Sequence, residues 1–264
     1  MNKQTRTANS IDVKKENLPM ASMFESDAHK GMEQMGADDL ALPFIRILGD
    51  LSPQVKKSKA EYVEGAEPGM LFNPVSKELY DGNKGIQVVP CYYKREYIEW
   101  SDRGEGPGAP IAVHPANTDL INQTNRDAMG KDRLSNGNYL ENTASYYVMV
   151  LSGSKDDASA ETALITMKAT GLKTSRQWNS MISGIKLQGQ NGKFTPPMFS
   201  HIYHLTTVEM SNKKGTWSTW SVSKKGLLED QQIYELAKNF ADSVSKGDVQ
   251  AKHGEESEEN KVPF

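Results

Sequence analysis

The side chains of this sequence that are best suited to binding chemistry are aromatic rings and the cationic groups of Lys and Arg. Many of them lie in one stretch, residues 85–100 (GIQVVPCYYKREYIEW). A single-stranded nucleic acid needs both groups, because its phosphates attract Lys and Arg and its unstacked bases lie on aromatic rings. Tyr and Trp are also ordinary core and rim residues, so each ring has a packing alternative. We expect stacking from Tyr92, Tyr93, Tyr97, Trp100 and Trp217, and phosphate contacts from Lys94, Arg95, Lys173, Arg176, Lys213, Lys214, Lys224 and Lys225.

Charge is unevenly distributed along the chain. The 264 residues carry a net charge of -3, which by itself argues against a nucleic-acid binder. Residues 161–226, however, hold nine Lys and Arg against two Glu, a local charge of +7. A basic body with a separate acidic end indicates an anionic partner for the body.

Catalytic motifs are absent from the sequence. It contains no CxxC, HExxH or GxSxG pattern. His201 and His204 would point to opposite faces of an expected strand, so they would not share a metal ion. The lone Cys91 lies in an apolar run and suits packing. We therefore expect a binding protein and not an enzyme, with no cofactor and no metal.

The last residues combine acidic side chains with a terminal ring. A partner pocket with a basic rim captures a C-terminal ring and carboxylate together. The acidic run could also occupy the protein's own basic groove, and a plain solubilising tail is the bland alternative. The residues expected to bind a partner protein are Glu255, Glu256, Glu258, Glu259, Pro263 and Phe264.

The elements that must position these residues follow from hydrophobic periodicity. We expect a disordered arm over residues 1–36, one domain over 37–247 with a long loop at 101–142, and an acidic tail over 248–264. Asp38 and Asp39 could open a short helix whose apolar side includes Phe44 and Leu48. Residues 69–80 read as a hairpin, with a turn at Asn73-Pro74.

In the central strand, strict alternation would place Ile86, Val88, Tyr92 and Trp100 on one face. Two later helices show a period of 3.6 residues. The first would begin at a capping box of Thr174 and Gln177 and bury Trp178, Met181, Ile182 and Ile185. The second would begin at Asp230 and end at Gly247, and its expected buried face is Ile233, Leu236, Ala237, Phe240 and Val244.

Residues 198–210 and 216–223 read as a hairpin in which Ser211 pairs with Thr216. That register leaves Trp220 half-buried and Trp217 exposed. Short strands, hairpins and no repeated βαβ unit indicate a mainly β fold. The sequence predicts an oligonucleotide-binding-like (OB-like) antiparallel Greek-key barrel with an internal helix and a C-terminal helix.

Two stretches resemble known families. The end, EESEENKVPF, resembles the acidic tip of bacterial single-stranded DNA-binding proteins, although Lys261 and the interrupted Glu run depart from it. The body resembles phage-encoded single-stranded DNA-binding proteins in DLALPFIRILGDLSP, VVPCYYKREYIEW, ATGLKTSRQWNSMI and GTWSTW. This resemblance implies a barrel that binds single-stranded DNA without sequence preference, and a tail that docks replication or recombination enzymes.

Other interpretations remain open from the sequence. They are a structural or assembly protein of a phage particle, a strand-annealing or nuclease-accessory protein, and a tail that contacts a transcribing polymerase. A homo-oligomer is possible. No apolar run is long enough to span a membrane, residues 1–20 lack the apolar stretch typical of a signal peptide, and the lone Cys91 has no partner for an internal disulfide. We therefore expect the cytoplasm of the host cell and no membrane partner.

Overall fold

The computed structural model describes residues 19–28, 30–35, 41–102, 105, 109–153, 159–213, 215–251 and 253. The chain divides into two units, Met1–Leu40 and Ala41–Phe264. The first unit contains helix α1 (Pro19–Ser26) followed by turns. The second unit holds every other helix and strand given below. No helix in the described ranges has the length and apolar character needed to cross a membrane.

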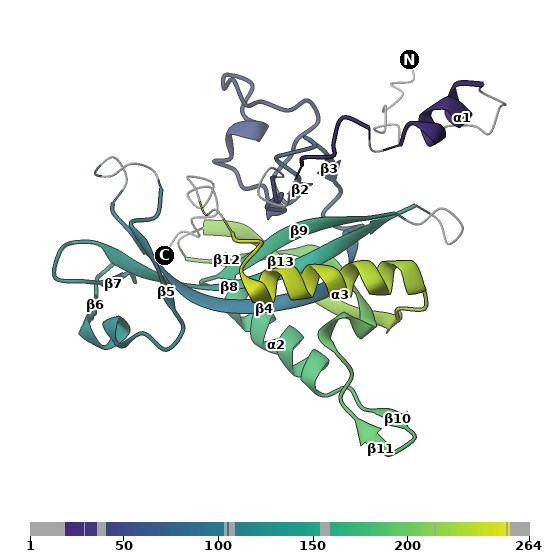
Figure 1. The fold of residues 1–264 in the computed structure, drawn as a ribbon. Helices are drawn as coiled ribbons and strands as arrows, with labels where there is room; N and C mark the ends of the chain where they lie inside the picture. The colour runs from purple at the N-terminus through teal and green to yellow at the C-terminus, as the bar shows by residue number, and fades with distance from the viewer. Residues whose placement is uncertain are drawn as a thin grey trace. The chain divides into compact units, whose positions relative to one another are not determined.

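Five long strands form the body of the second unit (Figure 1). They are β4 (Ile86–Trp100), β8 (Tyr139–Ser152), β9 (Ser159–Lys168), β12 (His201–Asn212) and β13 (Gly215–Leu227). All neighbours pair antiparallel, in the order β13-β12-β4-β8-β9. The sheet curls into a half-barrel. In chain order, helix α2 (Gly171–Ser183) follows the third long strand, β9, and precedes the fourth, β12. The predicted mainly β, OB-like fold with an internal helix is therefore confirmed.

A smaller sheet spans the open side of the curl. Its strands are β1 (Arg46–Ile47), β2 (Leu71–Phe72) and β3 (Leu79–Tyr80), and they include the predicted hairpin of residues 69–80. On one side, Phe44 forms a parallel bridge with Leu164 of β9, and Ile45 N–H donates to the Leu164 carbonyl at 2.9 Å. On the other side, Thr207 N–H of β12 donates to the Gly82 carbonyl at 2.8 Å.

The prediction of a short helix that opens at Asp38 and Asp39 is wrong for residues 41–48, the part of it that the structure describes. Residues 41–48 are extended, and burial alternates, with Ile45 and Ile47 buried and Phe44 and Arg46 partly exposed. The backbone partners come from β9 and β2, so long-range pairing overrides the local apolar spacing. Residues 38–40 lie outside the described residues.

Helix α2 seals the interior of the curl. Trp178 is fully buried and stacks on Tyr146 with ring centroids 4.2 Å apart, while Met181 and Ile182 pack on the same core. This confirms the predicted buried face for Trp178, Met181 and Ile182, whereas Ile185 lies beyond the end of the helix at Ser183 and is only partly buried. The predicted capping box is wrong, because the helix begins at Gly171 after Thr170. Thr174 instead donates its hydroxyl to the Trp220 carbonyl at 2.9 Å and ties the helix to β13.

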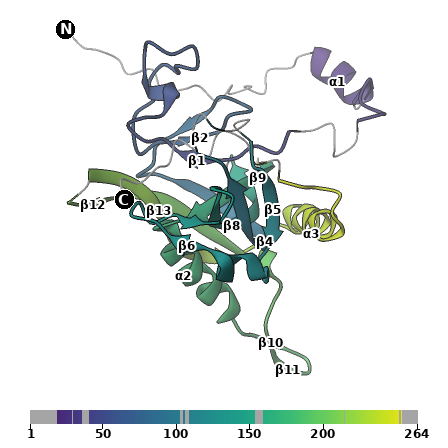
Figure 2. The same cartoon turned by 90° about the vertical axis from the view of Figure 1, so that its left-hand side faces the viewer.

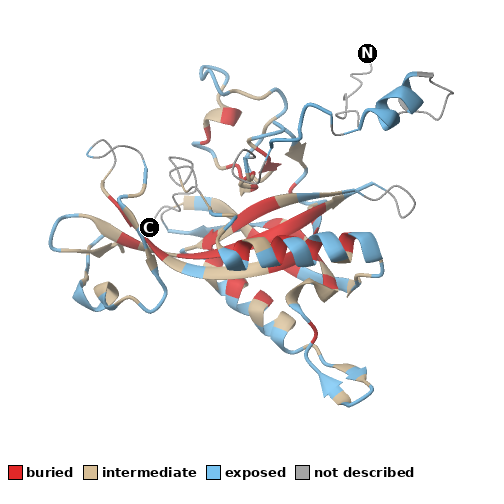
Figure 3. Ribbon diagram, in the orientation of Figure 1, coloured by how far each residue is buried: buried red, intermediate tan, exposed pale blue. Residues whose placement is uncertain are grey.

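Helix α3 (Gln231–Lys246) covers the outer face of β4, β8 and β9, away from α2 (Figures 2 and 3). It begins and ends as predicted, since Asp230 accepts from Ile233 N–H at 3.0 Å and Gly247 has φ 90°. Leu236 was expected in the buried face but is 51% exposed. The buried stripe runs through Ala237, Phe240 and Ala241, and Leu236 lies at its edge.

A β-bulge at Cys91 changes which side chains of β4 share a face. The pairing with β8 shifts between Pro90 and Tyr92, so Cys91 is an extra residue in the ladder. Tyr93, not Tyr92, therefore joins Ile86 and Val88 in the interior core. The strict alternation predicted for this strand is wrong beyond Cys91.

The connection between β4 and β8 is more structured than the predicted loop of residues 101–142. It contains β5 (Ala112–Pro115), the 3-10 helix η3 (Asp119–Gln123), β6 (Asn125–Arg126) and β7 (Asp132–Arg133). Strand β5 pairs with β4, and β7 pairs with β8, so the connection extends the end of the main sheet. A second 3-10 helix, η2 (Pro53–Val55), follows β1, and a third, η4 (Met198–Ser200), precedes β12.

Candidate functional site

A pocket of about 700 Å³ lies at the opening between β9 and β13, the two end strands of the five-strand order. One wall is the end of β9 and the start of α2, residues 166–172. The other wall is residues 216–220 of β13. Further lining comes from residues 126 and 130–132 of the β4–β8 connection, from residues 47–51, from the end of β4 with residue 101 and from the start of β8. Pro68 and Glu209 also line the pocket. The volume falls in the range of natural ligand sites.

Two tryptophans in the lining have unused hydrogen-bond donors. Trp100, at the end of β4, is 6% exposed, and Trp217 of β13 is half-buried. Neither indole N–H has a hydrogen-bond partner among the described residues, although both are buried. A buried Trp N–H normally finds a partner, but the N–H of Trp178 in the core also lacks one among the described residues, so the two donors allow a ligand in this pocket without requiring one. Trp217 was predicted to be exposed and Trp220 half-buried, but Trp220 is buried, so both are more enclosed than predicted.

The cations of the pocket lining are paired with acids. Lys168 contacts Glu141 at 3.1 Å, Arg126 contacts Asp132 at 3.2 Å, and Lys131 contacts Asp102 at 2.6 Å. The lining also contains Asp50 and Glu209. The lining thus holds three cations and four acids, a net charge of -1, which suits the flat, neutral part of a ligand better than a phosphate.

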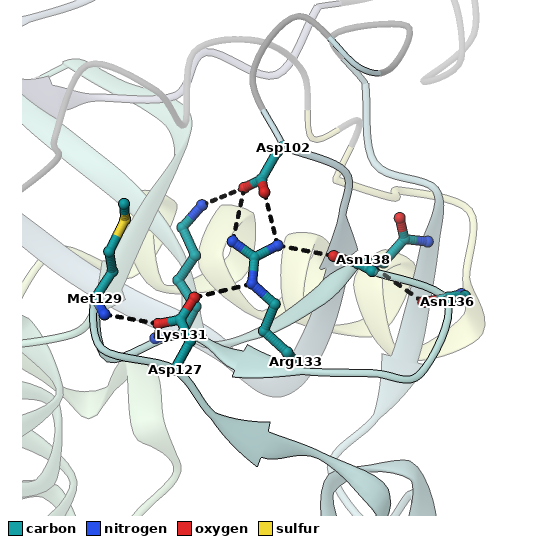
Figure 4. A network of polar contacts seen from close by, with 8 residues as sticks. Asp102, Asp127, Met129, Lys131, Arg133, Asn136 and Asn138 are labelled. Atoms are coloured by element: carbon teal, nitrogen blue, oxygen red, sulfur yellow. Dashed lines mark hydrogen bonds and ion pairs between the residues drawn. The ribbon is translucent and has the colours of Figure 1, made fainter.

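A network of charged residues holds the connection beside the pocket (Figure 4). Arg133 binds Asp102 at 2.7 Å through one nitrogen and Asp127 at 2.9 Å through another. Asp127 also accepts the backbone N–H groups of Met129 and Lys131. Hydrogen bonds from Arg133 and then Lys131 lower the pKa of Asp102 to about 2. Asp102 is thus ionised throughout the neutral range and keeps β7 in place.

A second cluster fastens the same connection to β4. Glu99 is buried and accepts hydrogen bonds from Asn138 at 2.6 Å, His114 at 2.9 Å and Asn136 at 3.2 Å. Burial alone would raise the pKa of Glu99, but these hydrogen bonds outweigh it and hold the pKa below its usual value. The β4–β8 connection, which forms part of the pocket wall, is therefore held by side-chain contacts near the ends of both strands that it joins.

Several predicted cations lie on elements that also contribute lining residues, although none of these cations lines the pocket itself. Lys173 and Arg176 are exposed on the first turns of α2, and Lys213 is exposed at the β12–β13 turn. Arg95 donates to Asn142, a lining residue, at 3.1 Å. Lys214 lies outside the described residues.

Other predicted contacts are placed away from the pocket. Tyr92 lies against Tyr147 on the α3 side with centroids 6.5 Å apart, and the Lys94 ammonium lies over the same Tyr147 ring. Tyr93 packs on Tyr146, and Tyr97 is buried under Arg95. Lys224 and Lys225 are exposed toward the other end of β13. The tail residues Glu255, Glu256, Glu258, Glu259, Pro263 and Phe264 lie outside the described residues.

Sequence reasoning missed the lining residues of the β4–β8 connection and the end of β9, among them Arg126, Lys131 and Lys168. Their signal was available in part. The acidic Asp127 precedes Gly130, and the basic Lys131 and Arg133 follow it. This order is typical of a hairpin whose two sides carry opposite charges. In the described part of the chain, no group of three or more His, Cys, Asp or Glu side chains is placed to hold a metal ion.

Comparison with known proteins adds one result. A family model described as Pam3 phage gp34-like protein matches residues 13–250. No curated protein and no solved structure matches the chain. The matched span contains every described helix and strand, including all residues that line the pocket.

Proposed function

The chain belongs to the Pam3 phage gp34-like protein family, and from this premise we propose that it binds single-stranded DNA, without reading its sequence, during phage DNA replication or recombination in the host cytoplasm. It would act by binding and not by catalysis. The observation that supports this most is the pocket between β9 and β13, with its two unpartnered tryptophan donors.

The position of the pocket supports a nucleic-acid ligand. Oligonucleotide-binding barrels use the face of their second and third strands and the loops between strands one and two and between strands four and five. The corresponding parts here are β8, β9, the connection after β4 and the turn between β12 and β13. Residues from all of these strands, from the connection and from the start of β13 line the pocket.

The distribution of charge suggests how single-stranded DNA would lie on the protein. Bases would enter the pocket, whose lining carries a net charge of -1, and stack on Trp217, since Trp100 is only 6% exposed. Each stack contributes about 1–3 kcal/mol. Phosphates would lie outside the lining, where Lys173, Arg176 and Lys213 are exposed. Such binding weakens with salt, with a slope near -0.7 in log–log form for each phosphate contacted.

The test is tryptophan fluorescence during titration with poly-thymidine oligonucleotides at two salt concentrations. We expect quenching that higher salt reverses, and a smaller signal with weaker binding for Trp217→Ala. Trp178→Phe is the matched control, since Trp178 is fully buried in the core and should leave the affinity unchanged. Replacing Lys173 and Arg176 by Gln should flatten the salt slope by about 1.4, and Lys238→Gln with Lys246→Gln on α3 should not.

No quenching at low salt would contradict the proposal. So would an affinity that does not change with salt. Stable high-order assembly without nucleic acid would instead favour a particle-assembly role.

The acidic tail completes the proposal as the part that recruits replication or recombination enzymes. A tail that serves partners is not needed to hold DNA. Deleting residues 255–264 should therefore leave the affinity for single-stranded DNA unchanged or slightly higher, because four Glu are removed. A large loss of affinity on this deletion would show that the tail is part of the DNA site.

A further inference from the structure

A small hairpin projects beyond the C-terminal end of α2 (Figure 1). It consists of β10 (Leu187–Gly189) and β11 (Gly192–Phe194), and Leu187 pairs with Phe194. The Phe194 ring is 47% exposed, although phenylalanine is usually enclosed. A Cβ atom on Gly189 would meet this ring at 3.1 Å, so the ring lies close over the glycine backbone and presents its other side outward.

The surroundings of this ring are basic. Lys186 and Lys193 are exposed on the hairpin, and the Lys186 ammonium donates to the Thr195 hydroxyl. The sequence from residue 162 to residue 208 contains no Asp or Glu. An exposed ring between cations on a projecting hairpin is the composition that single-stranded nucleic acids bind.

Helix α2 connects this hairpin to the pocket. Its first residues, Gly171 and Leu172, line the pocket, and its last residue, Ser183, lies four residues before the hairpin. The 13 residues of α2 span about 20 Å. Lys173 and Arg176 are exposed in the first half of α2, and the next cation along the chain is Lys186 at the hairpin.

We propose that the β10–β11 hairpin is a second contact for the same DNA strand that the pocket binds. Phe194 stacks a base, and Lys186 and Lys193 neutralise phosphates. The inference rests on the proposed function and extends it to a defined track along α2. About six stacked nucleotides cover about 20 Å at 3.4 Å each, so only a longer oligonucleotide reaches both contacts.

A protein partner fits this hairpin less well. Stable protein interfaces bury about 800 Å² on each side and have an apolar centre. The hairpin offers one apolar ring among exposed polar and basic residues, namely Lys186, Gln188, Gln190, Asn191 and Lys193. A polyanion with flat bases matches this surface in both charge and shape.

The experiment compares thymidine oligonucleotides of about 4 and about 16 nucleotides, the range of site sizes for such barrels. For the longer one, Phe194→Ala should weaken binding by about 5- to 150-fold, the equivalent of one lost stack. Lys186→Gln with Lys193→Gln should flatten its salt slope by about 1.4. Neither change should affect the shorter oligonucleotide bound in the pocket. The matched control, Lys238→Gln with Lys246→Gln on α3, should change neither length, and circular dichroism checks that each variant folds.

The possible results separate the two proposals. If Trp217→Ala weakens both lengths while the hairpin variants leave the longer oligonucleotide unaffected, the hairpin contact is overturned and the pocket stands. If the unaltered protein binds neither length, the proposed function fails. If the hairpin variants instead abolish self-association in sedimentation experiments and leave DNA affinity unchanged, the hairpin binds protein and the inference is wrong.

Discussion

At the scale of single residues, two buried tyrosines of the interior core differ in the hydrogen bonding of their hydroxyl groups. The Tyr146 hydroxyl contacts the Ser175 hydroxyl at 2.8 Å and the Asn179 side chain at 2.9 Å. The Tyr203 hydroxyl is buried and has no hydrogen-bond partner among the described residues. We expect Tyr146→Phe to lower the free energy of unfolding by about 1–3 kcal/mol, because it leaves buried partners unsatisfied.

Tyr203→Phe is the matched control for this prediction. It removes an unpaired buried hydroxyl, so we expect no loss of stability or a small gain. Urea unfolding followed by fluorescence measures both variants. Equal losses for the two would mean that hydroxyl pairing does not distinguish these positions.

The sequence predicts the types of residue at the candidate site better than their positions. Rings and cations were recognised as a set, but Tyr92, Tyr93 and Tyr97 pack against other side chains, whereas Trp100 and Trp217 line the pocket. A ring contributes to a core or to a binding surface through the same apolar area. Only the long-range neighbours of each ring separate the two roles, and a single sequence does not contain them.

At the scale of elements, the β4–β8 connection depends on an ionised Asp102. Its pKa is about 2, below the ordinary 3.8, because Arg133 and Lys131 donate to the carboxylate. The stabilisation is therefore complete only well above the ordinary pKa of 3.8, at pH of about 5 and higher, and it is lost as the pH falls through about 2. We expect the difference in urea midpoint between the unaltered protein and Asp102→Asn to be constant above pH of about 5 and to shrink below about 4. Asp119→Asn, exposed in η3, should show no such change; a constant difference down to pH of about 2 would refute the role of Asp102.

Elements set by local sequence were predicted well. The faces of α2, the cap at Asp230 and the Ser211–Thr216 register follow from periods of 3.6 and 2.0 and from turn residues. Elements set by distant partners were not. Residues 41–48 became extended because of Leu164, which lies more than a hundred positions away, and the β4–β8 connection became ordered because Asp102 and Glu99 meet Arg133 and Asn138.

At the scale of the whole molecule, the pocket lies between the two end strands of the sheet. Under the proposed function, single-stranded DNA bound there would contact β9, β13, α2 and the connection together, and an unfolded chain offers no such site. We expect an oligonucleotide at about 100 times its dissociation constant to raise the free energy of unfolding by about 2.7 kcal/mol. Urea midpoints with and without oligonucleotide measure this, and Trp217→Ala at the same concentration should show a smaller rise. Fluorescence quenching without any shift of the midpoint would indicate that the unfolded chain binds DNA equally well.

The bulge at Cys91 has a consequence for how this strand tolerates changes of length. Pro90 pairs with Val148 and Tyr92 with Tyr147, so losing Cys91 would join two stretches that are already in register. Every later side chain would keep its face. Losing one residue a little further on, for example Lys94, would turn the rest of β4 over and send Glu96 and Ile98 to the wrong sides. Among members of the family, we therefore expect deletions of one residue in this strand to be found at the bulge.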